Sequence, residues 1–312
     1  QRGYMRKEVI ITGVNGFVGG HLAQLLHDKG YTVRGIGREP KENENITGLL
    51  DAYSSADLLD AASLASLNMG SASAIIHLAG LASVADSFKY PDKYKVDNRT
   101  MADNLLTSAK VQGFTGRAVI ISTGAVYDAT QPMPLSEQSL TSGNSPYSIG
   151  KLATETVTLS HKHSGMDIVI ARPFNHIGPG QGSGFLLSDL YEQIVSAKQS
   201  GATTIGIGNL SSRRDYTDVR DIVVAYELLA NSPRLDHDIY NIASGNNYSS
   251  QEVLDMLQGA MHTHLQPIID QSKFRPTDAA EIIGDANRIK NELGWVPSIP
   301  LSKTIADYVS SK

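Results

Sequence analysis

Two hydrophobic patterns alternate along the chain: short runs of β-branched and other apolar residues, and longer segments with apolar residues at helical spacing. The longer segments predict helices at 17–29, 94–112 and 147–163. Several of the short runs are apolar throughout, which is typical of strands in a parallel sheet buried on both faces. This alternation predicts an α/β fold with a doubly wound parallel sheet. The predicted strands are 9–12, 32–36, 74–78, 118–122, 167–171 and 239–242.

The composition excludes several classes of function. The 312 residues include 27 Lys and Arg and 32 Asp and Glu, a net charge of -5, so the chain offers no basic surface to nucleic acid or to an anionic membrane. The absence of cysteine excludes disulfides, thiolate zinc sites and cysteine nucleophiles. No segment approaches the roughly 20 apolar residues of a membrane span. We therefore expect a cytoplasmic protein that binds neither membrane nor nucleic acid.

A glycine-rich turn follows the first predicted strand, where Gly13, Gly16 and Gly19 have GxxGxxG spacing. The first glycine permits a tight turn, the second lets the backbone approach a pyrophosphate, and the third lets the helix pack closely on the strand. The following helix, whose first residues are Phe17 and Val18, would point its N–H groups at the phosphates. An ordinary glycine turn is the alternative, but the position between strand and helix favours a dinucleotide site.

The cofactor preference depends on the residues that follow the second predicted strand. Gly37 and Arg38 stand where a site for NAD would carry a carboxylate on the ribose 2′-hydroxyl. A guanidinium can bind a 2′-phosphate through two hydrogen bonds, which favours NADP(H), although Glu39 is adjacent. The Asp57 carboxylate is placed either to accept a hydrogen bond from adenine or to cap a helix.

The stretch SPYSIGK at 145–151 predicts the start of a helix. Ser145 is a favourable N-cap residue, and Pro146 suits the first helical position. Tyr147 and Lys151 are four residues apart and would lie on one face. An ammonium and the positive helix end beside the phenol would lower its pKa from about 10, which favours proton transfer at neutral pH. For this pair alone, a solvated surface contact is the alternative.

The preceding strand supports the catalytic interpretation of this pair. Thr123 follows that strand at the carboxyl edge of the sheet, where ligands bind in such folds. Its hydroxyl would bind the substrate oxygen or stabilise a strand-end turn. Asp218 is expected to cap a helix that begins at Val219.

The histidines give weaker signals. His176 is equally consistent with a general base and with a structural loop histidine. The histidine pairs at 161–163 and 262–264 are not expected to bind metal, because side chains at i and i+2 diverge on a helix and no carboxylate partner is evident.

Together these motifs resemble the extended short-chain dehydrogenase/reductase superfamily. The features that match are the glycine-rich turn, DLLD at 57–60, HLAG at 77–80, Asn98, Thr123 and the Tyr–Lys pair. The resemblance implies a Rossmann domain in which Thr123 is the catalytic hydroxyl, Tyr147 the acid, and Lys151 a group that also holds the nicotinamide ribose. The cofactor-binding residues that it implies are Gly13, Gly16, Phe17, Val18, Gly19, Arg38, Asp57, Leu58, Leu78, Ala79, Gly80, Tyr147, Lys151 and Pro173.

The alternation of strands and helices weakens after Gly178, where Gly and Ser are frequent. This predicts a smaller C-terminal α/β lobe that binds the substrate. We expect the Rossmann domain to comprise 1–172 plus about 213–245, and the substrate lobe about 173–212 plus 246–312. Pro173 is expected to end strand pairing at the edge of the sheet. The side chains expected to face the cleft beyond it are Asn175, His176 and Gln181.

Blocks at 171–185, 208–221 and 273–297 are similar to those of GDP-4-keto-6-deoxy-D-mannose reductases, which make GDP-D-rhamnose. The resemblance implies that NADPH delivers hydride to C4 of the keto sugar and that Tyr147 protonates the oxygen. Arginine suits bidentate contact with a diphosphate; Arg214 and Arg275 are assigned this role, although each alone is as consistent with a solvated charge. The substrate-binding residues implied are Ser83, Thr123, Asn175, Arg214 and Arg275.

Sister reactions in this superfamily need residues that the chain lacks. Dehydratases carry a carboxyl acid and base after the active-site Thr, whereas Gly124 and Ala125 follow it here, and enzymes that form GDP-L-fucose use a cysteine. A C4 epimerase that retains NAD is the main alternative, and Arg38 disfavours it. A non-catalytic NADP-binding sensor is a further alternative, which the intact Thr, Tyr and Lys disfavour. Related enzymes suggest a homodimer through the helices that contain Tyr94 and Tyr147.

Overall fold

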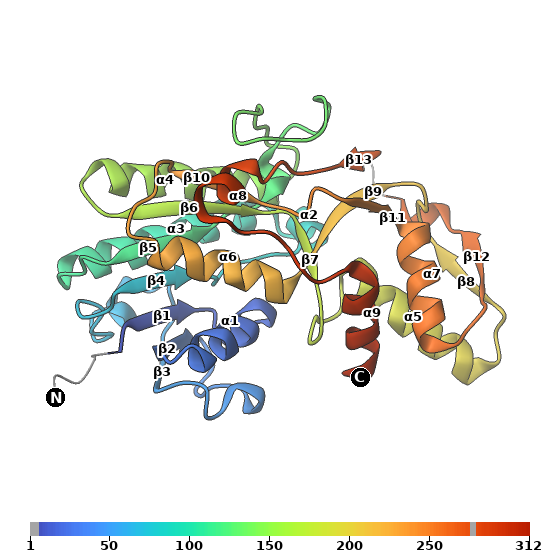
Figure 1. Cartoon of the computed structure of the whole chain (residues 1–312), viewed down its shortest axis with the longest axis horizontal. Helices are drawn as coiled ribbons and strands as arrows, with labels where there is room; N and C mark the ends of the chain where they lie inside the picture. Colours follow the sequence, from blue (N-terminus) through green and yellow to red (C-terminus); the bar gives the residue numbers. More distant parts are fainter. Residues whose placement is uncertain (1–5, 275–278) are drawn as a thin grey trace.

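A computed structural model describes residues 6–274 and 279–312, and its largest element is a seven-stranded sheet (Figure 1). The strands are all parallel, in the order β10-β6-β5-β4-β1-β2-β3. The predicted doubly wound α/β fold is therefore confirmed. The bounds are β1 Glu8–Thr12, β2 Thr32–Gly37, β3 Ala52–Ser55, β4 Ala74–His77, β5 Arg117–Ile121, β6 Ile168–Pro173 and β10 Ile239–Ile242.

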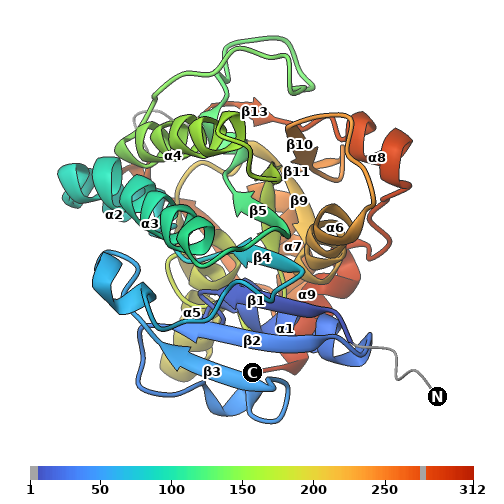
Figure 2. The ribbon, with the colours of Figure 1, turned by 90° about the vertical axis from the view of Figure 1, so that its left-hand side faces the viewer.

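Helices cover both faces of this sheet (Figure 2). On one face, α1 (Phe17–Asp28), α6 (Val219–Asn231) and α8 (Asn287–Leu293) bury apolar residues against alternate residues of the strands. On the other face α3 (Pro91–Val111) packs against the intervening strand residues, with α4 (Pro146–His163) beside it and the short α2 (Val84–Lys89) preceding it. Alternation of side chains along each strand thus divides the core into two layers.

The C-terminal part forms a smaller lobe with its own core (Figure 1). Its four-stranded sheet contains β7 (Asn175–Ile177), β9 (Arg213–Asp218), β11 (Asn247–Ser249) and β13 (Glu281–Ile282), and β8 (Thr204–Ile207) pairs with β12 (Gln266–Ile269). The helices of this lobe are α5 (Leu186–Ser200), α7 (Ser250–Met261) and α9 (Leu301–Ser310). Short 3-10 turns are η1 (Glu44–Ile46), η2 (Ala61–Leu64), η3 (Gly124–Val126) and η4 (Gln271–Lys273).

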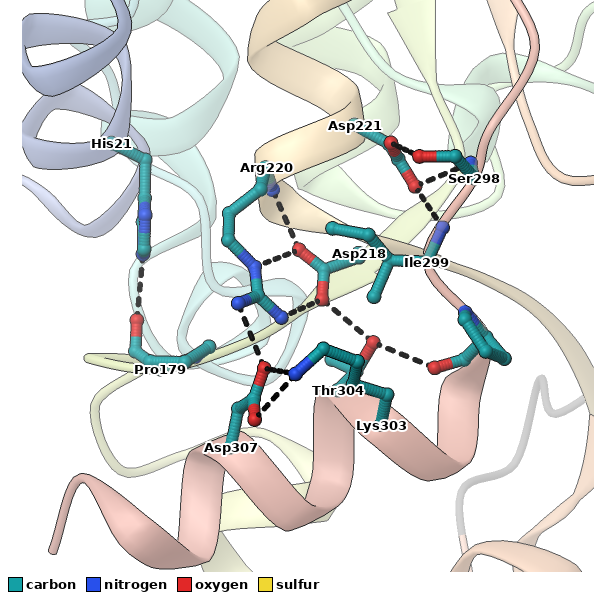
Figure 3. A network of polar contacts seen from close by, with 11 residues as sticks. His21, Pro179, Asp218, Arg220, Asp221, Ser298, Ile299, Lys303, Thr304 and Asp307 are labelled. Carbon is teal, nitrogen blue, oxygen red and sulfur yellow. Dashed lines mark hydrogen bonds and ion pairs between the residues drawn. The ribbon is translucent and has the colours of Figure 1, made fainter.

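Polar contacts join the two lobes at the start of α6 (Figure 3). Asp218 is buried and binds both Arg220 and Thr304 of α9, while Asp307 of α9 binds Arg220. The Asp221 carboxylate accepts hydrogen bonds from the backbone N–H groups of Ser298 and Ile299. The expected cap of α6 by Asp218 is confirmed, since its side chain accepts from Arg220 N at 2.8 Å.

Pro173 ends β6 but still pairs with Ile242 of β10, so β10, rather than β6, is the edge strand. The division into domains stays a prediction; β9 pairs within the smaller sheet, whereas α8 packs on the core of the large one. Within the described ranges, no helix is long and apolar enough to cross a membrane.

Candidate active site

The glycine-rich turn has the conformation that a dinucleotide site requires. Gly13 has φ +67°, and a β-carbon there would lie 2.8 Å from the backbone nitrogen of Ala79. At Gly19 a β-carbon would lie 2.5 Å from the Gly13 and Val14 carbonyl oxygens, so only glycine lets α1 lie this close to the turn. The N-cap residue of α1 is Gly16, which has no side chain to cover the first N–H groups of the helix. The turn therefore fits a diphosphate.

Arg38 follows β2 and is exposed, whereas Glu39 next to it is held by contacts with Asn15 and Tyr53. Asn15 of the glycine-rich turn donates to Glu39 Oε2 at 3.0 Å, and this hydrogen bond is the main reason that the pKa of Glu39 is lowered. The Tyr53 hydroxyl donates to the Glu39 carbonyl at 2.7 Å. The Glu39 carboxylate is thus bound to the glycine-rich turn, whereas Arg38 is exposed just beyond the end of β2.

Asp57 does not cap a helix, which was one of the two roles expected for it. Its carboxylate accepts from Leu59 N at 3.0 Å in a tight turn, and Asp60 caps η2 instead. The turn leaves the Asp57 side chain exposed and buries Leu58 in the core. Asp57 therefore stays a candidate for adenine binding.

The start of α4 forms as the sequence predicts. Ser145 is the N-cap, its hydroxyl accepts from Ser148 N at 3.1 Å, and the Ser148 hydroxyl accepts from Ser145 N at 3.0 Å. This reciprocal capping box and Pro146 in the first turn fix where the helix begins. Tyr147 and Lys151 consequently lie on one face, with only 8% and 9% of their surfaces exposed. They are not a solvated surface pair.

Burial shifts both groups of the pair, and the expected direction for the phenol is wrong. Burial raises the pKa of Tyr147 to about 12, while the hydrogen bond with the Thr123 hydroxyl opposes this rise. Burial lowers the pKa of Lys151 to about 8, an effect that the charge of Glu155 opposes. The Lys151 ammonium donates to the carbonyl of Ile121 at 2.9 Å. For the phenol, burial in low-dielectric surroundings thus outweighs the hydrogen bond from Thr123.

The end of β4 lies close to this pair. A β-carbon at Gly80 would lie 3.7 Å from the Lys151 ammonium nitrogen and 3.0 Å from Asn98 Oδ1. Asn98 fixes the segment that includes Leu78, Ala79 and Gly80, because its amide bonds both Leu81 N and Leu81 O, at 2.7 and 3.1 Å. His77 is buried, bonds Thr12 at 2.7 Å, and has a pKa lowered by burial to about 3. His77 is therefore neutral beneath the site.

A buried polar cluster behind Thr123 was not predicted from the sequence. The Ser122 hydroxyl donates to Glu155 Oε1 at 2.5 Å, and Arg172 forms an ion pair with Glu155, also at 2.5 Å. Thr123 itself accepts from Ala125 N at 3.1 Å, so its expected role in a strand-end turn is confirmed, and its hydroxyl also forms a hydrogen bond with Tyr147. Its contact with the substrate oxygen stays a prediction. The signal for Glu155 was its spacing, four residues after Lys151 on the same helical face.

The segment after β6, which begins with the short strand β7, differs in part from expectation. Asn175 is exposed, as a substrate contact requires, but Gln181 is buried and donates to the His176 carbonyl at 3.3 Å. The His176 imidazole bonds the Phe174 carbonyl at 3.0 Å and stacks on Phe17 at a ring distance of 6.4 Å. Burial lowers the pKa of His176. His176 is therefore a neutral ring packed against the first residue of α1.

Of the remaining substrate candidates, Ser83 and Arg214 are held by hydrogen bonds to the backbone. Ser83 caps α2, where its hydroxyl accepts from Asp86 N at 3.1 Å. Arg214 in β9 donates to the carbonyls of Arg213 and Ala279, both at 2.8 Å. Arg275 lies outside the described residues.

The expectation that the histidines at 161–163 lack a carboxylate partner is wrong. His161 does have a carboxylate partner, because its imidazole bonds Asp103 of α3 at 2.8 Å. This contact joins α3 to α4.

A parallel Rossmann sheet, a glycine turn closed by backbone contacts and a buried Tyr–Lys pair beside a strand-end Thr define an extended short-chain dehydrogenase/reductase. Residues 10–308 match the family described as GDP-mannose 4,6 dehydratase, and the chain belongs to this family within the NAD-dependent epimerase/dehydratases. It is 30% identical to the GDP-6-deoxy-D-mannose reductase of Pseudomonas aeruginosa, over 98% of this chain and 97% of that one. It is 28% identical to GDP-mannose 4,6 dehydratase 2 of Arabidopsis thaliana, over 96% and 85%.

Solved structures agree with the fold. The structure of RMD from Pseudomonas aeruginosa complexed with NADPH superposes with a TM-score of 0.83 at 29% identity, and covers 98% of both chains. UDP-glucose 4-epimerase of Thermotoga maritima, solved with UDP-glucose, superposes with a TM-score of 0.87 at 24% identity, over 97% and 98% of the two chains. The chain is thus an NAD(P)-dependent enzyme of the nucleotide-sugar-modifying class.

Proposed function

We propose that the protein reduces the C4 keto group of a nucleotide 4-keto-6-deoxy sugar with NADPH, and that it converts GDP-4-keto-6-deoxy-D-mannose to GDP-D-rhamnose. The observation that carries this proposal is the surroundings of Thr123. A β-carbon at Gly124 would lie 2.9 Å from the Phe174 ring. Because Phe174 fills the space beside Gly124, an acidic side chain does not fit there. Elimination therefore lacks one of its acid–base groups, while proton delivery by Tyr147 remains available.

The chain's own residues account for the proton step. NADPH, when bound, supplies the hydride that adds to C4. A Tyr147 phenol with its pKa near 12 carries its proton throughout the neutral range, so it is ready to donate to the developing alkoxide. Thr123 holds the phenol oxygen and would share the substrate oxygen. Lys151, in its protonated form, would stabilise the phenolate that remains.

The preference for NADPH over NADH rests on Arg38 and Glu39. A carboxylate beside the ribose would repel a 2′-phosphate, but Asn15 and Tyr53 bind Glu39 through its side chain and backbone. Arg38 is exposed at the end of β2, where a bidentate contact with the 2′-phosphate is possible. The NADPH-bound reductase from Pseudomonas aeruginosa, 29% identical, supports the same preference.

The substrate would lie between the Tyr–Lys pair and the smaller lobe. We assign contacts with it to Ser83, Thr123 and Asn175, and contact with the diphosphate to Arg214 and Arg275. Ser83 caps α2, Thr123 caps η3, Asn175 begins β7, and Arg214 of β9 donates to a backbone carbonyl of the smaller lobe. We also infer a homodimer through α3 and α4, whose outer surfaces expose Val96 and Ile149, and action in the cytoplasm.

The test is the oxidation of NADPH, followed by its near-ultraviolet absorbance, with GDP-4-keto-6-deoxy-D-mannose generated in place and the product identified by NMR. Formation of GDP-D-rhamnose supports the whole proposal. GDP-6-deoxy-D-talose would keep the reaction and reverse the face of hydride attack. Absence of NADPH oxidation, with NADPH still bound, would contradict the substrate assignment; interconversion of nucleotide-sugar C4 epimers by bound NAD would establish the epimerase instead.

A further inference from the structure

Three consecutive residues at the end of β5 contact three residues of α4 that are one helical turn apart. The Lys151 ammonium donates to the Ile121 carbonyl at 2.9 Å, and the Ser122 hydroxyl donates to Glu155 at 2.5 Å. Thr123 shares a hydrogen bond with Tyr147. Glu155 is therefore the third member of a row on α4 whose other two members are the candidate acid and lysine.

Glu155 is anchored from the far side by a buried cation. Only 5% of the surface of Glu155, and of Arg172, is exposed, and Arg172 contacts both carboxylate oxygens, at 2.8 and 2.5 Å. The Arg172 guanidinium also donates to the Tyr127 hydroxyl, which donates to Asn241 of β10 at 2.6 Å. A buried ion pair is a poor source of net stability, because desolvation offsets its attraction. Its position behind the active site points to a geometric role.

We propose that Glu155 is a positioning residue of the active site. Held by Arg172, it binds the Ser122 hydroxyl and so fixes the end of β5, with Thr123, against Tyr147 and Lys151. This inference rests on the proposed function for its kinetic test, but its structural part can be tested without any substrate.

The charge of Glu155 also acts on Lys151. The titratable groups that interact with the ammonium are Glu155 of α4 and the neutral His77 of β4. Tyr147 lies on the same face of α4, Arg172 of β6 pairs with Glu155, and Tyr94 of α3 packs on Tyr147. Burial lowers the pKa of Lys151, and Glu155 opposes that shift. Removal of the Glu155 charge would lower the pKa of Lys151 further, so that less of the lysine is protonated at neutral pH.

The kinetic test uses Ser122→Ala, which removes the link to β5 and leaves the ion pair between Glu155 and Arg172 in place. We expect kcat to fall about tenfold, because a small misplacement of catalytic groups lowers the rate by at least this much. The KM of the sugar and the Kd of NADPH should stay within a factor of about two, because the binding groups are retained. The control is Thr158→Val on the next turn of α4, because the buried Thr158 hydroxyl has no partner among the described residues. A kcat for Ser122→Ala equal to that of the control would overturn the proposal, as would a parallel loss of NADPH affinity.

The second test needs no substrate and uses lysines labelled with 13C at the ε-carbon. The NMR signal of Lys151, assigned by its absence from Lys151→Met, is titrated in the parent, in Glu155→Gln and in Ser122→Ala. We expect a lower Lys151 pKa in Glu155→Gln and no change in Ser122→Ala. An unchanged Lys151 pKa in Glu155→Gln overturns the role of the charge. If Glu155→Gln fails to fold, Ser122→Ala decides the proposal, through kcat and through the distance between Thr123 and Tyr147 in its crystal structure.

The two tests separate the failure of this inference from that of the proposed function. A parent protein that does not reduce the GDP-keto sugar contradicts the proposed function only. The Lys151 titration and the crystal structure of Ser122→Ala would still show whether Glu155 and Ser122 hold the row in place.

Discussion

At the residue scale, burial determines how Tyr147 and Lys151 divide the proton chemistry. A buried phenol with a pKa near 12 keeps its proton, whereas a buried ammonium with a pKa near 8 loses its proton more easily than a free lysine. In the proposed reaction the phenol is then a donor that is protonated throughout the neutral range. Its rate of donation depends on how well Lys151 and Thr123 stabilise the phenolate.

Tyr147→Phe removes the donor and retains the ring. We expect kcat to fall at least ~100-fold, the lower end of what a positioned acid contributes, while the Kd of NADPH changes no more than a few-fold. Steady-state kinetics and fluorescence titration with NADPH measure the two effects. Tyr308→Phe is the matched control, because the buried Tyr308 hydroxyl in α9 has no partner in the described part of the chain. An active Tyr147→Phe enzyme would show that another group donates the proton.

The pH dependence follows from Lys151. The pKa of this group is lowered from 10.5 to about 8, so the charged form is present below pH 8 and kcat is expected to fall as pH rises through about 8. The effect on stability has the opposite sign. Between pH 8 and 10.5 the unfolded chain binds more protons at this lysine than the folded protein does. The contribution of this group to the free energy of unfolding therefore increases with pH. Urea unfolding of the parent and of Lys151→Met across this range measures the difference. A pH-independent difference would contradict the lowered pKa.

Arg38→Ala tests cofactor preference at a single exposed residue. Loss of the guanidinium is expected to weaken NADPH binding roughly tenfold, the size of one good charge-assisted contact, and to leave NADH binding nearly unchanged, since NADH lacks the 2′-phosphate. Isothermal titration with both cofactors gives the two constants. Lys41→Ala, three residues further along, is the control for a general loss of positive charge. Equal losses for NADPH and NADH would show that Arg38 is misassigned.

At the element scale, the crossing of α3 and α4 sets the geometry of the site. A β-carbon at Gly150 would lie 1.9 Å from the Tyr94 carbonyl oxygen, so the two helices touch through their backbones next to Tyr147. Tyr94 also packs edge-on against the Tyr147 ring at 6.5 Å. Any displacement of α4 at this point moves Tyr147, the proposed acid, directly.

Gly150→Ala is therefore expected to destabilise the protein by ~2 kcal/mol or more, as overpacking against backbone does, and to lower kcat. Gly259→Ala in α7 is the control, because its β-carbon would meet nothing within 4 Å; there the change should stabilise by about 0.5–1 kcal/mol. Urea unfolding measures both. Equal stability of the two variants would mean that α3 and α4 separate easily, in conflict with their close packing.

The sequence predicted those elements whose signals are local. Central strands such as β1 and β4 are buried on both faces, so they appear as continuous apolar runs and were placed within a residue of their observed ends. The short strands of the smaller sheet were missed, because β9 reads RRDYTD and pairs with segments more than 30 residues away. Periodicity carries no information about such pairing.

The features of the site also divide into those set by neighbours in sequence and those set by distant contacts. The glycine-rich turn and the cap of α4 depend on neighbours in sequence and were predicted correctly. The bond between Ser122 and Glu155 spans 33 residues and requires a buried cation from a third element, so no local pattern shows it. The pKa direction of Tyr147 was wrong for a similar reason, since burial depends on packing from outside α4.

At the scale of the whole molecule, the position of the smaller lobe depends on the polar contacts at the start of α6 (Figure 3). Asp218 ends β9, the strand that carries Arg214, and begins α6 on the large sheet. Its carboxylate accepts from Thr304 of α9 at 2.7 Å, and Thr304 is fully buried. One residue thus joins the strand of the proposed diphosphate contact, the helix α6 on the large sheet and the last helix.

Thr304→Val removes this hydrogen bond and keeps the shape of the side chain. Asp218 retains Arg220, so we expect a loss of about 1–2 kcal/mol in the free energy of unfolding, the range for one hydrogen bond to a charged group. Because α9 and β9 belong to the lobe, the KM of the sugar nucleotide should rise while the Kd of NADPH stays constant. Lys303→Ala is the control, because Lys303 forms an exposed ion pair with Asp307 of α9 next to this contact. Loss of that ion pair should change neither the stability nor the KM measurably at moderate salt. An equal loss of sugar and NADPH affinity in Thr304→Val would show instead that the contact supports the large sheet as much as the lobe.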